Sequence, residues 1–326
     1  MIGRRAALAA IHRGAAFAAA LAMPAVARAQ AARDQLTLLL DWFLNPDHAP
    51  ILVAQERGDF ARAGLDVRVV APADPNDPPR LVAARRGDIG VFYQKNLHLA
   101  VDQGLPLVRV GTLVATPLAT LTVLRDGPIR SLADLRGRRV GYSVAGFEEA
   151  VMGAMLESVG LRLTDVRLVN VNFALASALM SGQVDAIVGG YRNFELHQLD
   201  IEGRPGRAFY PEQHGLPPYD ELIYIAHRDR ARDPILRRFI DATEAATHFL
   251  VNNPEESWRM FIAGPRRELD TELNRRAWAS TINRFTFSPG ALDRNRYERM
   301  ARFLAERRLI RSVPALETYA VELPPR

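Results

Sequence analysis

The feature that most constrains the fold of this chain is an alternation of short apolar segments with helix-like segments, and this alternation occurs twice. In the first copy, apolar segments of strand length at residues 36–40, 67–70 and 89–92 are separated by helix-like segments at 51–63 and 80–86. Strands that alternate with helices in this order are typical of a parallel sheet covered by helices. The first copy therefore predicts one α/β lobe.

The second copy repeats the same five elements further along the chain. Strands are predicted at residues 139–142, 166–170 and 184–188, with helices at 148–159 and 173–181 between them. Two copies in the same order predict two similar α/β lobes rather than one long sheet. A ligand is expected between the lobes, where the carboxyl ends of the strands face each other.

Extended segments rich in β-branched residues lie between and after the two copies, at residues 107–116, 121–124 and 221–226. They predict two passages of the chain between the lobes, so that the second lobe is an insertion in the first. The C-terminal segments are amphipathic and are expected as helices on a lobe surface. The predicted organisation is residues 30–124 for the first part of lobe 1, 125–221 for lobe 2, and 222–326 for the return to lobe 1 with its helical C-terminus.

The first 29 residues have the pattern of a secretory signal peptide. A basic start is followed by a small-residue apolar stretch at 14–26, and Ala27-Arg28-Ala29 has the small-x-small form of a signal-peptidase site, so cleavage is expected before Gln30. The apolar stretch is too short to span a bilayer. The pair Arg4-Arg5 leaves a twin-arginine export route open. Because the chain has no cysteine for a lipid anchor, we expect a protein retained in the periplasm.

Composition excludes several classes of function. The formal net charge is +5, but four arginines lie in the first 29 residues, and removing them leaves +1. A nearly neutral body lacks the basic surface that nucleic-acid binding requires. The absence of cysteine excludes disulfides, thiolate metal sites and thiol catalysis. Lys95 is the sole lysine beside many arginines, which we interpret as genomic composition.

No enzyme motif is present in the sequence. It contains no nucleophile elbow, phosphate loop, dinucleotide fingerprint or paired-histidine zinc motif, and its histidines are scattered. Ser143 lies at a strand-to-helix turn with the wrong spacing for a nucleophile, so we expect it to bond to backbone or ligand. No catalytic residue, metal or cofactor is predicted.

Polar and aromatic residues follow three predicted strands, at residues 41–48, 93–96 and 189–195. All three segments fall at the carboxyl ends of strands, where open α/β sheets bind ligands. Aromatic faces combined with carboxylates and amides suit a flat heterocycle with amino donors, because the rings stack on it and the carboxylates accept from its amine.

Several segments resemble one branch of the periplasmic solute-binding proteins, the branch for thiamine pyrimidine precursors, which includes formylaminopyrimidine-binding proteins of thiamine-salvage ABC importers. The resemblance covers nearly all of the mature chain. The motifs at 132–141 and 182–186 are shared with sulfonate and nitrate binders, so they support the fold alone. The segments at 41–48 and 191–195 narrow the range of ligands to that of this branch. The segments that carry it are 40–50 (LDWFLNPDHAP), 53–60 (VAQERGDF), 64–67 (GLDV), 132–141 (LADLRGRRVG), 182–186 (GQVDA) and 219–223 (YDELI).

The resemblance implies a bilobal type II periplasmic-binding-protein fold, α/β in class, with two parallel-sheet lobes joined by two hinge crossovers. It implies a monomer that closes on an aminopyrimidine and delivers it to an ABC permease. By this likeness Asp41 and Glu195 face the aminopyrimidine, Trp42 and Tyr191 stack on it, and Asn45 and Tyr93 are further pocket residues. The predicted ligand-binding residues are Asp41, Trp42, Asn45, His48, Tyr93, Ser143, Tyr191, Asn193 and Glu195.

Two alternatives stay open at this point. The ligand could be another small nutrient, such as a riboflavin-like ring or an organosulfonate, although an anion binder should offer more basic cleft loops. The chain could instead be a pyridoxal-phosphate-dependent pyrimidine synthase, because such enzymes share the scaffold. Those enzymes carry a lysine and a histidine just after the third strand and a cysteine cluster. Here Phe92 and Asn96 occupy the two positions, and Lys95 and His98 lie off register.

Overall fold

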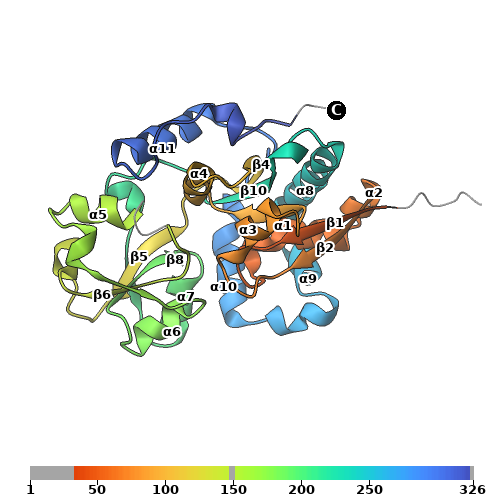
Figure 1. Ribbon diagram of the computed structural model, residues 1–326. Helices are drawn as coiled ribbons and strands as arrows, with labels where there is room; N and C mark the ends of the chain where they lie inside the picture. The colour runs from red at the N-terminus through yellow and green to blue at the C-terminus, as the bar shows by residue number, and fades with distance from the viewer. Residues whose placement is uncertain (1–32, 147–150, 324–326) are drawn as a thin grey trace, which may run out of the picture. The chain divides into compact units, whose positions relative to one another are not determined.

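The structure is a computed structural model that describes residues 33–146 and 151–323, and the expected signal peptide lies outside the described residues (Figure 1). The described residues form two five-stranded sheets, ordered β2-β1-β3-β10-β4 and β7-β6-β8-β5-β9. The strands are β1 (Asp34–Leu39), β2 (Leu65–Val70), β3 (Ile89–Phe92), β4 (Leu107–Val114), β5 (Ala119–Leu124), β6 (Arg139–Tyr142), β7 (Arg167–Asn170), β8 (Ala186–Tyr191), β9 (Gly206–Phe209) and β10 (Leu222–His227).

Helices connect the strands and cover the sheets (Figure 1). In the described part of the chain, none of them is both long enough and apolar enough to cross a membrane. The helices are α1 (Ala49–Glu56), α2 (Asp59–Arg62), α3 (Asp77–Ala83), α4 (Gln94–Asp102), α5 (Gly153–Glu157), α6 (Leu175–Met180), α7 (Glu195–Ile201), α8 (Pro234–Asn252), α9 (Pro254–Phe261), α10 (Glu272–Thr281) and α11 (Arg294–Glu306), and a short 3-10 helix, η1, spans Pro46–His48.

Both sheets are mixed rather than wholly parallel. Strand β1 pairs in parallel with β2 and β3, and β6 pairs in parallel with β7 and β8, as the alternating pattern predicts. The segments predicted as extended passages are strands as well, because β10 lies antiparallel between β3 and β4 and β5 lies antiparallel between β8 and β9. A strand inside a sheet satisfies the backbone N–H and C=O groups that a bare buried crossover would leave unpaired. Each passage therefore completes a sheet.

The helices differ from the sequence prediction at three places. The helix predicted at 51–63 is divided into α1 and α2 at Gly58, whose φ of +73° lies in the left-handed region that glycine adopts readily. Helices α4 and α7 begin in segments expected to be loops. Both begin with polar residues, Gln94 and Glu195, which the fold buries. A periodicity analysis treats buried polar residues as solvent-facing, so it misses these helices.

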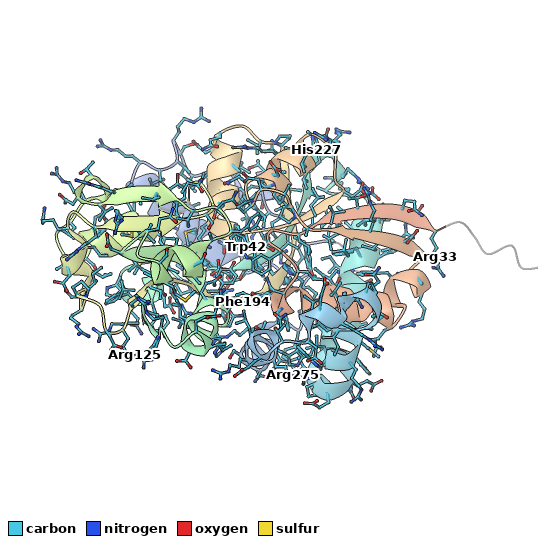
Figure 2. All side chains as sticks on the ribbon, turned by 90° about the horizontal axis from the view of Figure 1, so that it is seen from below. Arg33, Trp42, Arg125, Phe194, His227 and Arg275 are labelled. Atoms are coloured by element: carbon cyan, nitrogen blue, oxygen red, sulfur yellow. The ribbon has the colours of Figure 1, made fainter. Side chains whose placement is uncertain are left out.

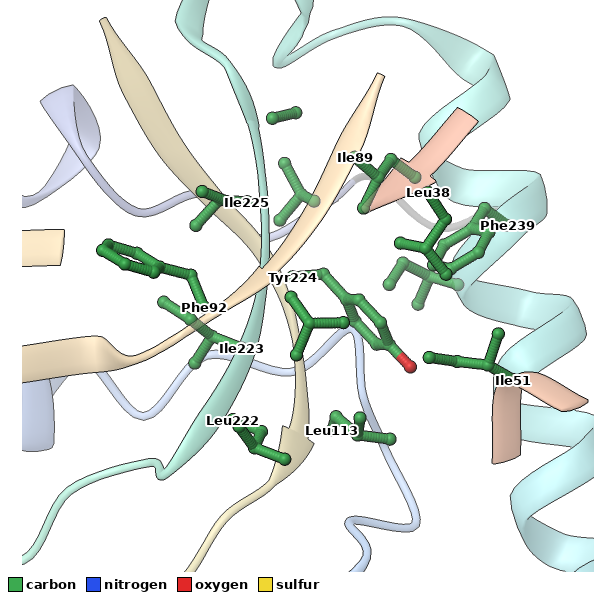
Figure 3. Close-up of a cluster of buried hydrophobic side chains, with 14 of the residues drawn as sticks. Leu38, Ile51, Ile89, Phe92, Leu113, Leu222, Ile223, Tyr224, Ile225 and Phe239 are labelled. Carbon is green, nitrogen blue, oxygen red and sulfur yellow. The ribbon is translucent and has the colours of Figure 1, made fainter. Parts of the chain in front are cut away.

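The core of the first sheet is centred on β10 and α8 (Figure 3). The ring of Phe239 from α8 stacks on Phe60 at 5.3 Å between centroids and meets the edge of Tyr224 from β10 at 5.2 Å. Every residue of β10 is buried. The strand that returns from the second sheet is thus fully buried in the first core.

The C-terminal helix α11 packs against both cores. Its residue Tyr297 belongs to the apolar cluster of the first sheet, whereas Met300, Phe303 and Leu304 belong to the cluster of the second. Asp220, just before β10, accepts hydrogen bonds from Tyr297 at 3.2 Å and from Thr112 of β4 at 2.8 Å. The start of the returning strand is thereby bonded to α11 as well as to the sheet.

Candidate functional site

A cavity lies between the two sheets, at the ends of β1, β3 and β8. It encloses about 630 Å³, including the part that is open to solvent. Figure 2 labels Trp42 and Phe194, which line it from the first and the second sheet respectively. The lining residues are Asp41, Trp42, Asn45, Asp47, His48, Tyr93, Lys95, Ser143, Val144, Leu175, Val188, Gly189, Tyr191, Phe194, Glu195 and Glu221.

The structure brings together most of the residues that the sequence singles out. The residues of the predicted set that line the cavity are Asp41, Trp42, Asn45, His48, Tyr93, Ser143, Tyr191 and Glu195. Asn193 lies outside the lining and is buried behind it, with its amide on Asp47 and Thr281. The hydroxyl of Ser143 donates to the backbone carbonyl of Asn172.

Asp41 is held from two sides by hydrogen-bond donors. The Tyr93 hydroxyl donates to one carboxylate oxygen at 2.8 Å, and His48 Nε2 lies 2.9 Å from the other. The carboxylate is only 3% exposed. Burial and the neighbouring Asp41 charge both raise the pKa of Tyr93. Its hydroxyl therefore stays protonated and donates a hydrogen bond to Asp41.

The orientation of His48 follows from the turn in which it lies. Asn45 caps η1, because its side-chain oxygen accepts the backbone N–H of Asp47 at 2.8 Å. In return, His48 Nδ1 accepts the backbone N–H of Asn45 at 3.3 Å. A ring nitrogen that accepts carries no proton, so the imidazole proton is on Nε2 and is donated to Asp41. Capping of one short turn thus positions the Asp41 carboxylate.

The opposite wall presents Glu195, at the first position of α7. Its carboxylate accepts the backbone N–H of Tyr191 at 2.5 Å, and burial raises its pKa to about 7. Gly190 makes this approach possible, because a Cβ there would lie 3.3 Å from Glu195 Cγ and 3.2 Å from Ile187. At neutral pH the Glu195 carboxyl can therefore either donate a proton to a ligand or accept one from it.

Aromatic rings from both sheets bound the cavity. The Trp42 ring meets the edge of Phe173 at 4.5 Å, so a residue that follows β1 contacts a residue that follows β7. Tyr191 has a buried hydroxyl with no hydrogen-bond partner among the described residues. A buried polar group without a protein partner at a cavity wall is available to a ligand.

Lys95 and Glu221 form a buried ion pair at the base of the cavity. Both side chains are almost fully buried, at 1% and 0% exposure, and the ammonium group also lies 4.5 Å from the centre of the Tyr219 ring. The second oxygen of Glu221 accepts the backbone N–H groups of Leu118 at 2.7 Å and Ala119 at 2.9 Å. Glu221 therefore bonds the return passage to the point at which the first passage enters the second sheet.

Sequence reasoning missed Asp47, Lys95 and Glu221 as lining residues. Asp47 lies within the segment 41–48 that it did single out, and Lys95 is the sole lysine of the chain. A single lysine among many arginines was a sign that this position requires an ammonium group. An ammonium can form an ion pair in a small buried space where a guanidinium would not fit. Glu221 lies in the segment 219–223 that carries the resemblance, but the local sequence does not indicate that its side chain is buried.

The charge of the cavity is predominantly negative. Carboxyl groups come from Asp41, Asp47, Glu195 and Glu221. Against them the described lining residues offer one lysine, Lys95, and the imidazole of His48, and no arginine. In the described part of the chain, no cluster of histidines and carboxylates could hold a metal ion. Such a cavity favours a flat ligand that is neutral or cationic and rich in hydrogen-bond donors, and it disfavours an anion.

Several known proteins are similar to this chain in sequence. A protein of Haemophilus influenzae whose name assigns it provisionally to thiamine biosynthesis is 47% identical over 90% of this chain and 93% of its own. The formylaminopyrimidine-binding protein of Halalkalibacterium halodurans is 34% identical over 71% of each chain. A more distant relative, at 25% identity over 85% of this chain and 88% of its own, is the 4-amino-5-hydroxymethyl-2-methylpyrimidine phosphate synthase of Legionella pneumophila.

Solved structures share the fold. The alkanesulfonate-binding protein of Xanthomonas axonopodis aligns over 89% of this chain and all of its own, with a TM-score of 0.70 and 18% identity. This likeness confirms the type II periplasmic-binding-protein fold that the sequence predicts. The family described as NMT1/THI5 like matches residues 45–257. The chain therefore belongs to the NMT1/THI5-like family.

Proposed function

We propose that this protein is the substrate-binding subunit of an ABC importer and that it captures an aminopyrimidine precursor of thiamine in the cavity between the sheets. The observation that carries the proposal is the pair of buried carboxyls on opposite walls, Asp41 and Glu195, with aromatic rings beside them. The name of the relative from Halalkalibacterium halodurans supports the same ligand class. The signal-peptide pattern and the likeness to periplasmic binding proteins support export and delivery to a permease.

The two carboxyls suit the two edges of an aminopyrimidine. Asp41 is an oriented acceptor for the exocyclic amine, because its own donors already fix its direction. Glu195, with a pKa of about 7, can share a proton with a ring nitrogen in either direction. The rings of Trp42 and Tyr191 supply faces on which the pyrimidine can stack.

A sulfonate ligand is disfavoured by the same cavity. An organosulfonate requires basic groups or free backbone N–H groups. Here Lys95 is already paired with Glu221 and His48 with Asp41, and no arginine is among the described lining residues. Two buried carboxyls would repel the anion.

A synthase activity is disfavoured by the placement of Lys95 and His98. Lys95 lines the cavity but is ion-paired, whereas His98 lies outside the lining, against the rings of Tyr297 and Tyr319. Burial lowers the pKa of His98 to about 3, so it is a neutral core residue. The lysine and the histidine do not meet in one cavity.

Calorimetric titration of the purified protein with 4-amino-5-hydroxymethyl-2-methylpyrimidine, its phosphate ester, riboflavin and methanesulfonate tests the proposal. We expect binding of the unphosphorylated pyrimidine, and we expect Glu195→Gln to weaken it by about 2 kcal/mol, or about thirtyfold, because ligand donors would face amide donors. Glu202→Gln, at the exposed end of the same helix, is the matched control and should bind as the wild type does. Equal binding by Glu195→Gln would contradict recognition by carboxylates.

Incubation with pyridoxal phosphate tests the synthase alternative. An imine of Lys95 would give a new absorbance band, and we expect none because the ammonium is held by Glu221. Appearance of the band, and its loss in Lys95→Arg, would show that Lys95 forms an imine with pyridoxal phosphate and would support the alternative.

A further inference from the structure

A cluster of three polar side chains joins the two sheets beside the cavity. The amide nitrogen of Asn193, which follows β8, donates to Asp47 Oδ1 at 2.6 Å and to Thr281 Oγ1 at 2.6 Å. Asp47 lies in η1, after β1, and Thr281 ends α10, whose Trp278 packs in the core of the first sheet. These side chains are 1%, 2% and 1% exposed. The hydrogen bonds therefore connect the second sheet to the first away from bulk water.

Every donor of this cluster has an acceptor, while the side-chain oxygen of Asn193 has no partner among the described residues. Both amide protons of Asn193 are used, one on the Asp47 carboxylate and one on the Thr281 hydroxyl. The Thr281 hydroxyl lies 2.7 Å from the carbonyl of Ala277, so it can donate there and accept from Asn193. The Asp47 charge fixes the orientation of the amide, because a flipped Asn193 would place its oxygen against a carboxylate.

Asp47 belongs to this cluster and to the cavity wall at once. Its Oδ1 accepts from Asn193 at 2.6 Å and lies 3.2 Å from the Thr281 hydroxyl, and the same side chain lines the cavity. The titratable groups that face it are His48 and Asp41 from its own segment and Glu195 from the opposite wall. A ligand that donates to the second oxygen would bond to the same carboxylate that holds the lobes together.

We propose that Asn193 is a positioning residue and that it forms, with Asp47 and Thr281, a closure latch that holds the two lobes together and couples closure to ligand through the shared Asp47 carboxylate. The coupling rests on the proposed function, because it requires a donor-bearing ligand. Holding the lobes together does not require it. The latch stabilises the closed state by bonds that the ligand does not make, so weakening it lowers the affinity for every ligand of the cavity.

A second set of cross-lobe bonds provides a matched comparison. The side chain of Asn76, before α3, donates to the carbonyl of Ser143 at 3.3 Å and accepts the backbone N–H of Ala145 at 2.9 Å. Like Asn193, Asn76 contributes one amide and two bonds between the sheets. Asn76 is partly exposed, and its two bonds across the lobes are to neutral backbone groups, so water can replace those bonds at little cost.

The experiment measures closure directly in the full chain. Because the chain contains no cysteine, Arg68→Cys on β2 and Arg167→Cys on β7 create the two labelling positions, both exposed and both on edge strands of their sheets. Electron–electron double resonance between spin labels there reports the distance distribution with and without saturating 4-amino-5-hydroxymethyl-2-methylpyrimidine. Calorimetry on the same variants gives the affinity, and thermal unfolding verifies that each variant is folded.

We expect Asn193→Ala to move the ligand-free distribution to longer distances and to weaken binding about tenfold, with the short distance restored at saturating pyrimidine. Thr281→Val, which keeps the side-chain shape, should act in the same direction and replaces Asn193→Ala if that variant does not fold. Asp47→Asn keeps an acceptor for Asn193 and should stay closed, yet it should lose affinity because the charge in the wall is gone. Asn76→Ala should change the affinity by less than about threefold.

The proposal is overturned if Asn193→Ala, or Thr281→Val in its place, leaves the ligand-free distance distribution of the wild type unchanged. It is also overturned if Asn76→Ala opens the protein as much as Asn193→Ala does. If the wild type binds no aminopyrimidine and Asn193→Ala still opens the protein, the latch is supported and the ligand assignment fails. The two failures are therefore distinguishable.

Discussion

The two walls of the cavity differ in how far the protein itself satisfies their polar groups. On the first wall, both oxygens of Asp41 receive donors, one from Tyr93 and one from His48. On the second wall, Glu195 accepts a backbone N–H from Tyr191, burial raises its pKa to about 7, and the Tyr191 hydroxyl has no partner among the described residues. Each carboxylate oxygen of Asp41 thus has one protein donor and can still accept a ligand amine, whereas the Tyr191 hydroxyl has no donor or acceptor among the described residues.

This difference suggests a division of labour between the walls. A pre-oriented carboxylate costs little to use on binding, because its conformational freedom is already lost on folding. A buried carboxyl with a raised pKa is destabilised in its charged form by the loss of solvation. A ligand that donates hydrogen bonds to it offsets that cost. We therefore expect substitutions on the first wall to affect stability most, and substitutions on the second wall to affect ligand binding most.

The largest expected effect is on stability, at Asp41. Asp41→Ala removes the acceptor of two buried donors, and hydrogen bonds to a charged group contribute about 1.5–3 kcal/mol each, so we expect a loss of about 3–5 kcal/mol in the free energy of unfolding. Glu195→Ala should cost less than about 2 kcal/mol, because it removes one backbone bond and an unfavourable burial. Urea unfolding of the ligand-free variants measures both. A larger loss for Glu195→Ala would reverse the comparison.

The second prediction concerns pH and the burial of Glu195. Its pKa is raised from 4.5 to about 7, so the folded state binds a proton more tightly than the unfolded state. The stabilisation of the folded state by this proton is fully present below pH 4.5 and is lost as the pH rises through about 7. The wild type should therefore gain up to about 3 kcal/mol relative to Glu195→Gln as the pH falls across this window.

Subtracting the variant isolates Glu195 from other titrating groups. Asp47, with a pKa raised to about 6, acts in the same direction, and His98, with a pKa lowered to about 3, acts in the opposite one. Both residues remain in wild type and variant. Urea unfolding between pH 4.5 and 8 gives the stability of the wild type and of Glu195→Gln as a function of pH. Parallel curves for the two proteins would contradict the raised pKa of Glu195.

The smallest expected effect compares two tyrosines, one from each wall. Tyr93→Phe removes a donor to Asp41 and should cost about 1.5–3 kcal/mol of stability. Tyr191→Phe removes a hydroxyl without a protein partner, so stability should stay within about 0.5 kcal/mol of the wild type. Its aminopyrimidine affinity should fall about fivefold, because a buried hydrogen bond to ligand contributes about 1 kcal/mol. Thermal unfolding and calorimetry on the pair would sharpen the contrast, and equal destabilisation would remove it.

Much of the fold was predictable because short stretches of the sequence, through their apolar periodicity, indicate most of its strands. The strand predicted at residues 139–142 is β6 with the same bounds, and the strand predicted at 89–92 is β3. The two predicted α/β lobes rest on apolar periodicity, which depends on near neighbours in the chain. The signal peptide, the lobe boundaries and the identity of the ligand stay predictions.

The candidate site was predictable where a motif lies in one short segment. Residues 41–48 combine a strand end, a capped turn and four of the polar side chains that line the cavity, so the sequence alone indicates their proximity. The helices α4 and α7 were missed because each begins with a polar residue that is buried. An analysis of local periodicity expects polar residues to face solvent.

The sequence by itself determined the repeated lobes and the polar ends of the strands. Only the tertiary structure decided that β5 and β10 complete the two sheets, that Lys95 pairs with Glu221, and that Asn193 bonds to Asp47 rather than lining the cavity. Each of these contacts joins residues about a hundred or more positions apart in the chain or depends on burial that no local pattern encodes. Long-range pairing is chosen by the shape and the desolvation of the whole fold, because a buried polar group is tolerated only where a distant partner meets it.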